Sequence, residues 1–182
     1  ADFNIMEGLT FTVNGSLYKY DRRYTYVNSP FVDHYTSSND NGSVSKGSYT
    51  TKTYNTQQLL NYVKTFGLHD VSAMIGHEYY NYEYQSLSGS GWNFGIDNAT
   101  ELNSLLNLNY PSSYSSRYNN EGFFFRGMYS YDSKYYGSFS IRRDASSRFH
   151  KDNRWGNFWS VGAAWVISKE DFFDVDWIDM LK

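Results

Sequence analysis

Apolar and polar side chains alternate along much of this chain. From Leu9 to Leu17 every second residue is apolar or glycine, and the residues between them are polar. The same alternation recurs, less regularly, at residues 71–75, 137–141 and 159–167. Successive side chains of a strand point to opposite faces, so this pattern predicts strands with one apolar face and one polar face.

The connections between these segments are of two kinds. Tight turns are expected at Glu7–Leu9, Gly67–Asp70 and Asp132–Lys134, and long polar connections at residues 29–48, 87–120 and 145–157. In the second connection, NATELNSLL predicts a short helix capped by Asn98, with Glu101 at the capping-box position and a stripe of leucines. A short amphipathic tail is expected after the last strand, over residues 170–182.

Short turns at one end of the strands and long loops at the other are typical of outer-membrane barrels. About six strands of about 10 to 18 residues are expected, long enough for a tilted membrane crossing. The predicted fold class is therefore all-β, a transmembrane antiparallel β-barrel segment, with residues 1–182 in one barrel domain. Barrels begin at about eight strands and open edges in lipid are costly, so we expect the chain to be part of a larger barrel.

Two alternatives share the alternating pattern. A soluble or surface carbohydrate-binding β-sandwich also alternates, but its connections would be of mixed length at both ends. A complete small barrel or adhesin would need at least two more strands than the pattern predicts.

Composition narrows the classes of function. Of the 182 residues 20% are aromatic, including 19 Tyr, while the mean hydropathy is -0.66. No cysteine is present for a disulfide or a thiolate metal site, and a net charge of -3 without a basic run argues against a nucleic-acid partner. No run of about 18 apolar residues predicts a membrane helix. The chain does not open on a signal-peptide pattern, as expected for a processed start or a piece of a longer polypeptide.

One long motif is specific. The segment RRDASSRFHKDNRWGNFWSVGAAW resembles the pattern of the SusC/RagA family of TonB-linked outer-membrane transporters, and Ala145 stands where glycine is usual. Upstream, Gly76, His77 and Glu78 match the family's Gly-His-Glu segment. The matching motif residues, which we interpret as mainly structural, are Arg142, Arg143, Asp144, Ser146, Ser147, Arg148, Phe149, Asn153, Arg154, Trp155 and Gly156, followed by Ser160, Gly162 and Trp165.

The resemblance implies a barrel of about 22 strands in the bacterial outer membrane, with an N-terminal plug. It also implies coupling to the TonB complex, a SusD-like lipoprotein lid and import of oligosaccharides, or of peptides in some members. The plug and the TonB-binding segment are not expected within these residues, which correspond to the middle-to-late part of the barrel. No enzyme activity and no cofactor are implied.

Several residues are candidates for contact with a substrate. Aromatic rings stack on the apolar faces of sugars, although loop aromatics more often pack on one another. The candidate ligand contacts in the loops and the lumen are Tyr35, Trp92, Phe94, Tyr110, Tyr114 and Arg126.

Enzyme and metal sites are not predicted. Glu78 and Glu83 would point to opposite faces of one strand, which argues against a paired-carboxylate glycosidase. The four histidines are scattered, and Asp33, Asp40 and Asp97 lack the spacing of a calcium loop.

The barrel prediction depends on one arrangement. Seven side chains are expected to face hydrocarbon while their neighbours in sequence face a watery interior: Leu9, Phe11, Val13, Phe139, Ile141, Val161 and Trp165.

Overall fold

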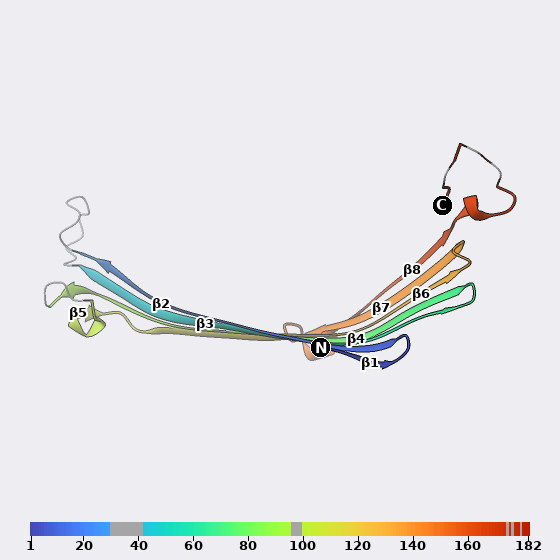
Figure 1. The fold of residues 1–182 in the computed structure, drawn as a ribbon. Helices are drawn as coiled ribbons and strands as arrows, with labels where there is room; N and C mark the ends of the chain where they lie inside the picture. Colours follow the sequence, from blue (N-terminus) through green and yellow to red (C-terminus); the bar gives the residue numbers. More distant parts are fainter. Residues whose placement is uncertain (30–41, 96–99, 174, 176, 179) are drawn as a thin grey trace. The chain divides into compact units, whose positions relative to one another are not determined.

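All the strands of the protein belong to one antiparallel sheet. The computed structural model describes residues 1–29, 42–95, 100–173, 175, 177–178 and 180–182. Its strands are β1 (Asp2–Met6), β2 (Leu9–Asn28), β3 (Ser43–Phe66), β4 (His69–Phe94), β5 (Leu105–Leu108), β6 (Ser112–Tyr131), β7 (Tyr135–Ser146) and β8 (Trp155–Trp165) (Figure 1). Their order in the sheet is β1-β2-β3-β4-β6-β7-β8, with β5 paired to β4. The prediction of an all-β fold is confirmed, with six long strands and two short ones among the described residues.

Helices are few and short. The described residues contain three 3-10 helices, η1 (Leu102–Ser104), η2 (Lys151–Asn153) and η3 (Ile167–Lys169). None of the helices in these ranges has the length and apolar character needed to cross a bilayer. The turn η3 precedes the amphipathic tail predicted at residues 170–182, and the described residues of that tail form no helix.

Strands β2, β3, β4 and β6 each contribute residues to two compact units, whereas β7 and β8 belong to one. Unit 1 comprises Ala1–Ser16, Tyr54–Asn81 and Tyr118–Lys182, and unit 2 comprises Leu17–Thr53 and Tyr82–Arg117. Each unit has its own set of contacts and is described separately.

Unit 1 contains the tight turns and the most regular pairing. The predicted turns are confirmed at residues 7–8, 67–68 and 132–134. Gly8 and Gly67 have positive φ angles of 80° and 59°, which a glycine adopts without strain. Pairing from β6 to β7 and from β7 to β8 proceeds residue by residue, from Asn120 opposite Ser146 to Tyr135 opposite Trp165. Because no bulge interrupts this register, each of these strands keeps one set of side chains on each face.

Unit 2 contains a small apolar core. Val44 is fully buried, and Phe94 and Leu105 are 9% and 7% exposed, with Leu102 packed against them. Gly42 has a φ of 80°, and a Cβ there would lie 2.4 Å from the Phe94 ring, so this position requires glycine. The core holds η1 and β5 against β4.

All three predicted long connections proved shorter than expected, the third because residues 145–146 belong to β7 and residues 155–157 to β8. Residues 43–48 belong to β3, and residues 87–94 and 112–120 belong to β4 and β6. These segments are rich in serine, glycine and tyrosine and lack apolar alternation, so periodicity alone did not identify them as strands. Strands therefore reach 26 residues, in β4, beyond the expected upper length of about 18.

The predicted helix around Glu101 is wrong. The chain forms only the single turn η1 and then pairs as β5 with β4, Leu105 lying opposite Phe94. The Glu101 carboxylate contacts Lys46 Nζ at 2.6 Å and makes no cap hydrogen bond. The leucines alternate as in a strand and do not form a helical stripe, since Leu105 is buried and Leu106 is 74% exposed. Asn98 lies outside the described residues.

The neighbouring leucines Leu105 and Leu106 provide a test of the core of unit 2. Replacing Leu105 with alanine should lower the local free energy of opening at β4 and β5 by about 2 to 5 kcal/mol, because it removes buried side-chain volume. Leu106→Ala should change it by less than about 0.5 kcal/mol. Hydrogen exchange of the amides of residues 89–94 measures both, and equal effects would contradict the assignment.

Candidate functional site

The two faces of the sheet in unit 1 differ in chemistry. Phe139 lies opposite Val161, and Ile141 lies opposite both Phe125 and Trp159, so these side chains share a face. His77 on β4 stacks on Phe123, two residues from Phe125, with centroids 4.6 Å apart, which brings the odd-numbered residues of β4 to the same face. We call this the apolar face; its residues on these four strands include Val71, Ala73, Ile75, Phe125, Gly127, Phe139, Ile141, Trp159, Val161 and Ala163.

Strand β2 follows the same division. The Gln58 amide bonds the His77 ring at 2.7 Å, so its neighbour Gln57 points to the other face. Asn14 donates to Gln57, and the alternate residues Leu9, Phe11 and Val13 therefore lie on the apolar face. All seven residues named in the sequence prediction thus share one face of a single sheet.

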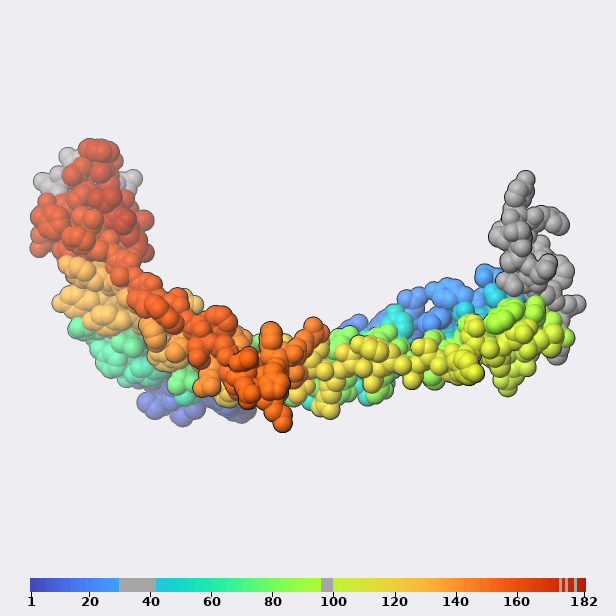
Figure 2. Space-filling view, turned by 180° about the vertical axis from the view of Figure 1, so that it is seen from behind, coloured from blue at the N-terminus to red at the C-terminus, as the bar shows by residue number. Residues whose placement is uncertain are grey.

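No second sheet covers the apolar face among the described residues. Trp159, Val161 and Ile75 are 72%, 67% and 57% exposed. Figure 2 shows the β7–β8 hairpin, in orange, at the edge of the sheet that is toward the viewer. A soluble β-sandwich would bury such side chains between two sheets, so the single layer argues against that alternative.

The opposite face of unit 1, which we call the polar face, contains serines and charged groups. The Ser140 and Ser160 hydroxyls lie 2.8 Å apart, and Asp70 accepts hydrogen bonds from Thr65 and Ser130. Arg126 lines a hollow on this face together with Ser138 and other small side chains of β7 and β8. Among the described residues, no carboxylate lies within ion-pair distance of Arg126.

Two rows of aromatic rings bound the apolar face. At the turn end, His69, Tyr131, Tyr135 and Trp165 follow one another with centroids 4.9, 6.4 and 6.2 Å apart. At the other end, His77, Phe123 and Trp155 do so at 4.6 and 6.2 Å.

The distance between the two rows fits a membrane crossing. They are eight residues apart on β4 (69 to 77) and ten on β8 (155 to 165). At about 3.3 Å per residue this is about 26 to 33 Å along the strands. Tilted membrane strands need about 9 to 11 residues.

The family motif forms a network within the chain. Arg142 Nε lies 2.8 Å from each carboxylate oxygen of Asp144, and its guanidinium lies 5.3 Å from the Phe124 ring centroid and 3.8 Å from Glu78. All of these groups are on the polar face. The structural role of Arg142 and Asp144 stays a prediction.

The rest of the motif ties the β7–β8 loop to β6. The Ser147 amide donates to the Asn119 carbonyl at 2.9 Å, and the Asn119 amide donates to Ser147 Oγ at 2.8 Å. Arg148 lies 3.9 Å from the Tyr118 ring centroid, and the Ser146 amide donates to the Arg154 carbonyl. The β7–β8 loop is thus held to β6 by hydrogen bonds to Asn119 and by the contact of Arg148 with Tyr118.

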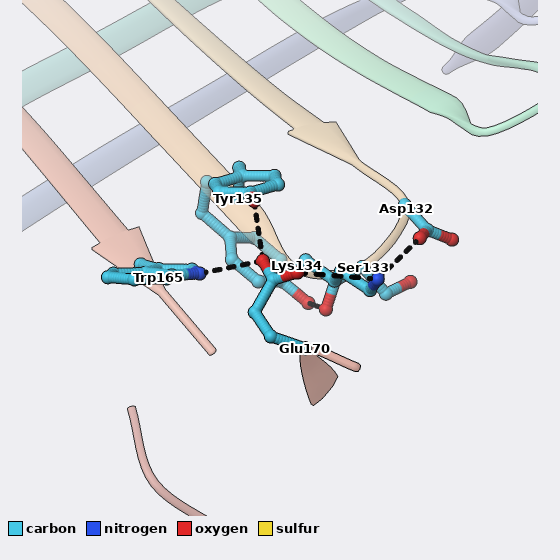
Figure 3. A network of polar contacts seen from close by, with 7 residues as sticks. Asp132, Ser133, Lys134, Tyr135, Trp165 and Glu170 are labelled. Atoms are coloured by element: carbon cyan, nitrogen blue, oxygen red, sulfur yellow. Dashed lines mark hydrogen bonds and ion pairs between the residues drawn. The ribbon is translucent and has the colours of Figure 1, made fainter. Parts of the chain in front are cut away.

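Glu170 connects the segment after β8 to the β6–β7 turn. Tyr135 Oη and Trp165 Nε1 both donate to Glu170 Oε1, and Lys134 Nζ lies 3.7 Å from Oε2 (Figure 3). The Val166 amide donates to the Lys134 carbonyl at 2.7 Å. The hydrogen bonds from Tyr135 and Trp165, with the charge of Lys134, lower the pKa of Glu170 below its ordinary value.

A row of four tyrosines crosses unit 2. Tyr20, Tyr49, Tyr84 and Tyr114 lie on β2, β3, β4 and β6, with successive centroids 5.8, 6.0 and 6.1 Å apart. Tyr114 is 61% and Tyr20 40% exposed. Arg22 donates to the Tyr49 hydroxyl at 3.2 Å, which lowers the pKa of Tyr49. We call these four residues the tyrosine row.

A hollow with a neutral lining lies beside the tyrosine row. Its lining consists of small residues and hydroxyl-bearing side chains, and none of them is charged: Tyr24, Ser45, Ser88, Gly89, Ser90, Tyr110 and Ser112. On each strand the row residue and a hollow residue are separated by an even number of positions, as in the pairs Tyr20/Tyr24, Tyr49/Ser45, Tyr84/Ser88 and Tyr114/Ser112. The row and the hollow therefore share a face of unit 2. We call this hollow the hydroxyl hollow.

The predicted ligand residues lie in different surroundings. Tyr114 belongs to the tyrosine row and Tyr110, 98% exposed, lines the hydroxyl hollow. Trp92 is half-buried opposite Asn107 on β5, whereas the Phe94 ring is occupied by the core of unit 2. Arg126 lies on the polar face of unit 1, and Tyr35 lies outside the described residues.

Sequence reasoning missed Tyr20, Tyr49 and Tyr84. Tyrosine at residues 18, 20, 24 and 26 shows the period of two that could have identified one face of β2. The cross-strand neighbours, however, depend on pairing register, which the sequence does not provide.

Comparisons with known proteins agree with this architecture. No protein-family model matches the chain. It is 34% identical over 144 residues to the TonB-dependent receptor SusC of Bacteroides thetaiotaomicron, covering 78% of this chain and 14% of that protein. It is 32% identical over 149 residues to a TonB-dependent receptor of Formosa agariphila, covering 79% and 14%. The chain thus spans about a seventh of the length of these curated relatives.

A solved structure extends the similarity to almost the whole chain. The RagAB peptide transporter matches with a TM-score of 0.87 and 27% identity, over 97% of this chain and 20% of that one. Its open-open state matches with a TM-score of 0.86. The single sheet of this chain is thus similar to a stretch of a barrel transporter.

The Glu170 network predicts a response to acid. The pKa of Glu170 is lower in the folded state, so the carboxylate stabilises the fold at pH values above its ordinary, unfolded pKa. That stabilisation should disappear as the pH falls through the lower, folded pKa. Glu170→Gln should reduce the protection factor of the Val166 amide at neutral pH and remove its acid dependence. Hydrogen exchange, corrected for the intrinsic rate, measures both; an unchanged profile would contradict the role of the carboxylate.

Proposed function

We propose that this chain, which belongs to the SusC/RagA family of TonB-dependent receptors, forms part of the barrel wall of an outer-membrane nutrient importer. The observation that carries the proposal is the pair of aromatic rows bounding an exposed apolar face. In this orientation the apolar face meets lipid and the rows lie at its two interfaces. The polar face, with Arg126, Arg142 and Asp70, lines the aqueous interior.

Backbone hydrogen bonding supports membership of a larger barrel. Strands β1 and β8 each pair with one described neighbour, and the order of strands does not bring them together. An unpaired edge is costly in hydrocarbon because its amide and carbonyl groups have no water to bind. We propose that further strands of the same barrel domain complete these edges, and that residues 1–182 lie within that one domain.

The substrate proposed for the importer is an oligosaccharide. The tyrosine row offers stacking surfaces on adjacent strands, and the hydroxyl hollow offers uncharged hydrogen-bonding groups, both suited to sugar rings. Tyr110, Tyr114 and Trp92 are proposed to contact the substrate outside the membrane, and Arg126 to contact it in the lumen. A peptide is the second candidate, since a structural relative is described as a peptide transporter.

The proposed partners follow from the family. A SusD-like lipoprotein would cover the loop end, and the TonB complex would supply energy through parts of the protein beyond this sheet. In this proposal the substrate crosses without bond chemistry, in keeping with relatives named as receptors and as a transporter.

Adjacent residues of β8 test the orientation of the sheet. Val161→Arg in the full-length receptor should destabilise the membrane-inserted fold by about 2 to 4 kcal/mol, because it brings a charge to the middle of the lipid-facing surface. Ser160→Arg, on the polar face, should be tolerated. Heat-modifiable migration and denaturant unfolding in phospholipid vesicles measure the difference, and equal stability of the two variants would refute the proposed orientation.

The tyrosine row tests the class of substrate. Tyr49→Ala and Tyr84→Ala should each weaken binding of neutral linear hexasaccharides about 2- to 10-fold, through loss of ring stacking, while Tyr→Phe at each position retains it. Leu87→Ala, an odd number of positions from Tyr84 and 56% exposed, is the matched control. Calorimetry with α- and β-1,4-linked hexasaccharides and with hexapeptides of the same length distinguishes the candidates. A loss confined to the peptides would favour the second candidate.

A further inference from the structure

Arg143 places a charged side chain on the apolar face of unit 1, among aliphatic and aromatic residues. It lies directly opposite Phe123 on β6 and Asn157 on β8, and it is exposed. Its neighbour Arg142 points to the polar face and binds Asp144 there, so the two arginines of the motif serve opposite faces of the sheet.

The Arg143 guanidinium has an aromatic support but no acidic partner. It lies 4.9 Å from the centroid of the Trp155 ring. Among the described residues no carboxylate lies within ion-pair distance of it. The acidic group on the same face, Glu121, is bound to His77 at 3.1 Å.

The position of Arg143 on the sheet limits which anionic groups can pair with its charge. It lies level with the aromatic row of His77, Phe123 and Trp155, at the boundary of the apolar face. An arginine in hydrocarbon is costly, but at an interface its forked donors match the oxygens of a phosphate. Asn157, opposite Arg143 and exposed, adds an amide donor on the same side.

We propose that Arg143 and Asn157, with Trp155 beneath the guanidinium, bind the phosphate group of a lipid in the outer leaflet. The inference rests on the proposed function, which orients the apolar face toward lipid. Short turns lie on the periplasmic side of such barrels, so the motif end of the sheet meets the outer leaflet. A phosphorylated glycolipid of that leaflet supplies the anion, and its acyl chains continue along Ile141, Trp159 and Val161 toward the turns.

The experiment measures lipid retention by the full-length receptor. The protein is exchanged into phosphatidylcholine nanodiscs containing bis-phosphorylated lipid A or its dephosphorylated form, and bound lipid is quantified by native mass spectrometry. Wild type should retain the phosphorylated form, and Arg143→Gln should weaken this retention about tenfold. Arg143→Lys should fall between them because it keeps the charge but loses the fork. Glu121→Gln should strengthen retention by removing a nearby negative charge.

Controls separate this inference from simpler explanations. Lys151→Gln removes an exposed charge from the β7–β8 loop and should leave lipid retention unchanged. Inorganic phosphate should not displace the lipid, because a free anion lacks the acyl chains; displacement would overturn a lipid-specific site. Equal retention of both lipid A forms by wild type, or unchanged retention in Arg143→Gln, would also overturn the proposal. Failure of the proposed function would appear separately, as equal stability of Val161→Arg and Ser160→Arg.

Discussion

Hydrogen bonding between neighbouring strands is the constraint on which the other features of this protein depend. A single sheet has no second layer to fix its side chains, so strand register alone decides which residues share a face. The uninterrupted pairing of β6, β7 and β8 keeps Phe139, Ile141 and Val161 together on one side and the serines on the other. Register between neighbouring strands likewise brings together the members of the aromatic rows and of the tyrosine row.

Several specific polar contacts of unit 1 lie near the two ends of its strands. The Glu170 network lies at the turn end, and the contacts of Arg142, Ser147 and Arg148 lie at the motif end. Between them the face carries aliphatic and aromatic groups, for which a lipid environment offers no competing hydrogen bonds. In the proposed orientation these polar contacts lie at the margins of the sheet, where water and lipid headgroups would solvate charged side chains. Its middle depends on backbone pairing and on the shape of its side chains.

The extent of sequence-based prediction differs between the two units. In unit 1 the alternation around Phe11 and Val161 predicted the faces, and Gly8 and Gly67 marked turns that the structure contains. In unit 2 the strands are rich in serine, glycine and tyrosine and carry few aliphatic residues, so the aliphatic alternation that marked the faces of unit 1 is absent, although the tyrosines of β2 recur with a period of two. The helix predicted near Glu101 failed because the residues after η1 pair as β5 with β4, a contact between distant segments that the local sequence does not show. The tyrosine row was not predicted either, because its four side chains come from four strands whose pairing register is not evident from the sequence.

The division of Arg142 and Arg143 between opposite faces has a consequence for assembly errors. If β7 slipped by one position, the Arg142 guanidinium, which binds Asp144, would turn to the apolar face. Arg143 would turn to the polar face, away from the Trp155 ring. Arg142 would lose its contact with Asp144 and Arg143 its contact with Trp155, so the shifted register would be destabilised at both residues. Two adjacent arginines with opposite orientations therefore favour the native register of the hairpin over a register shifted by one residue.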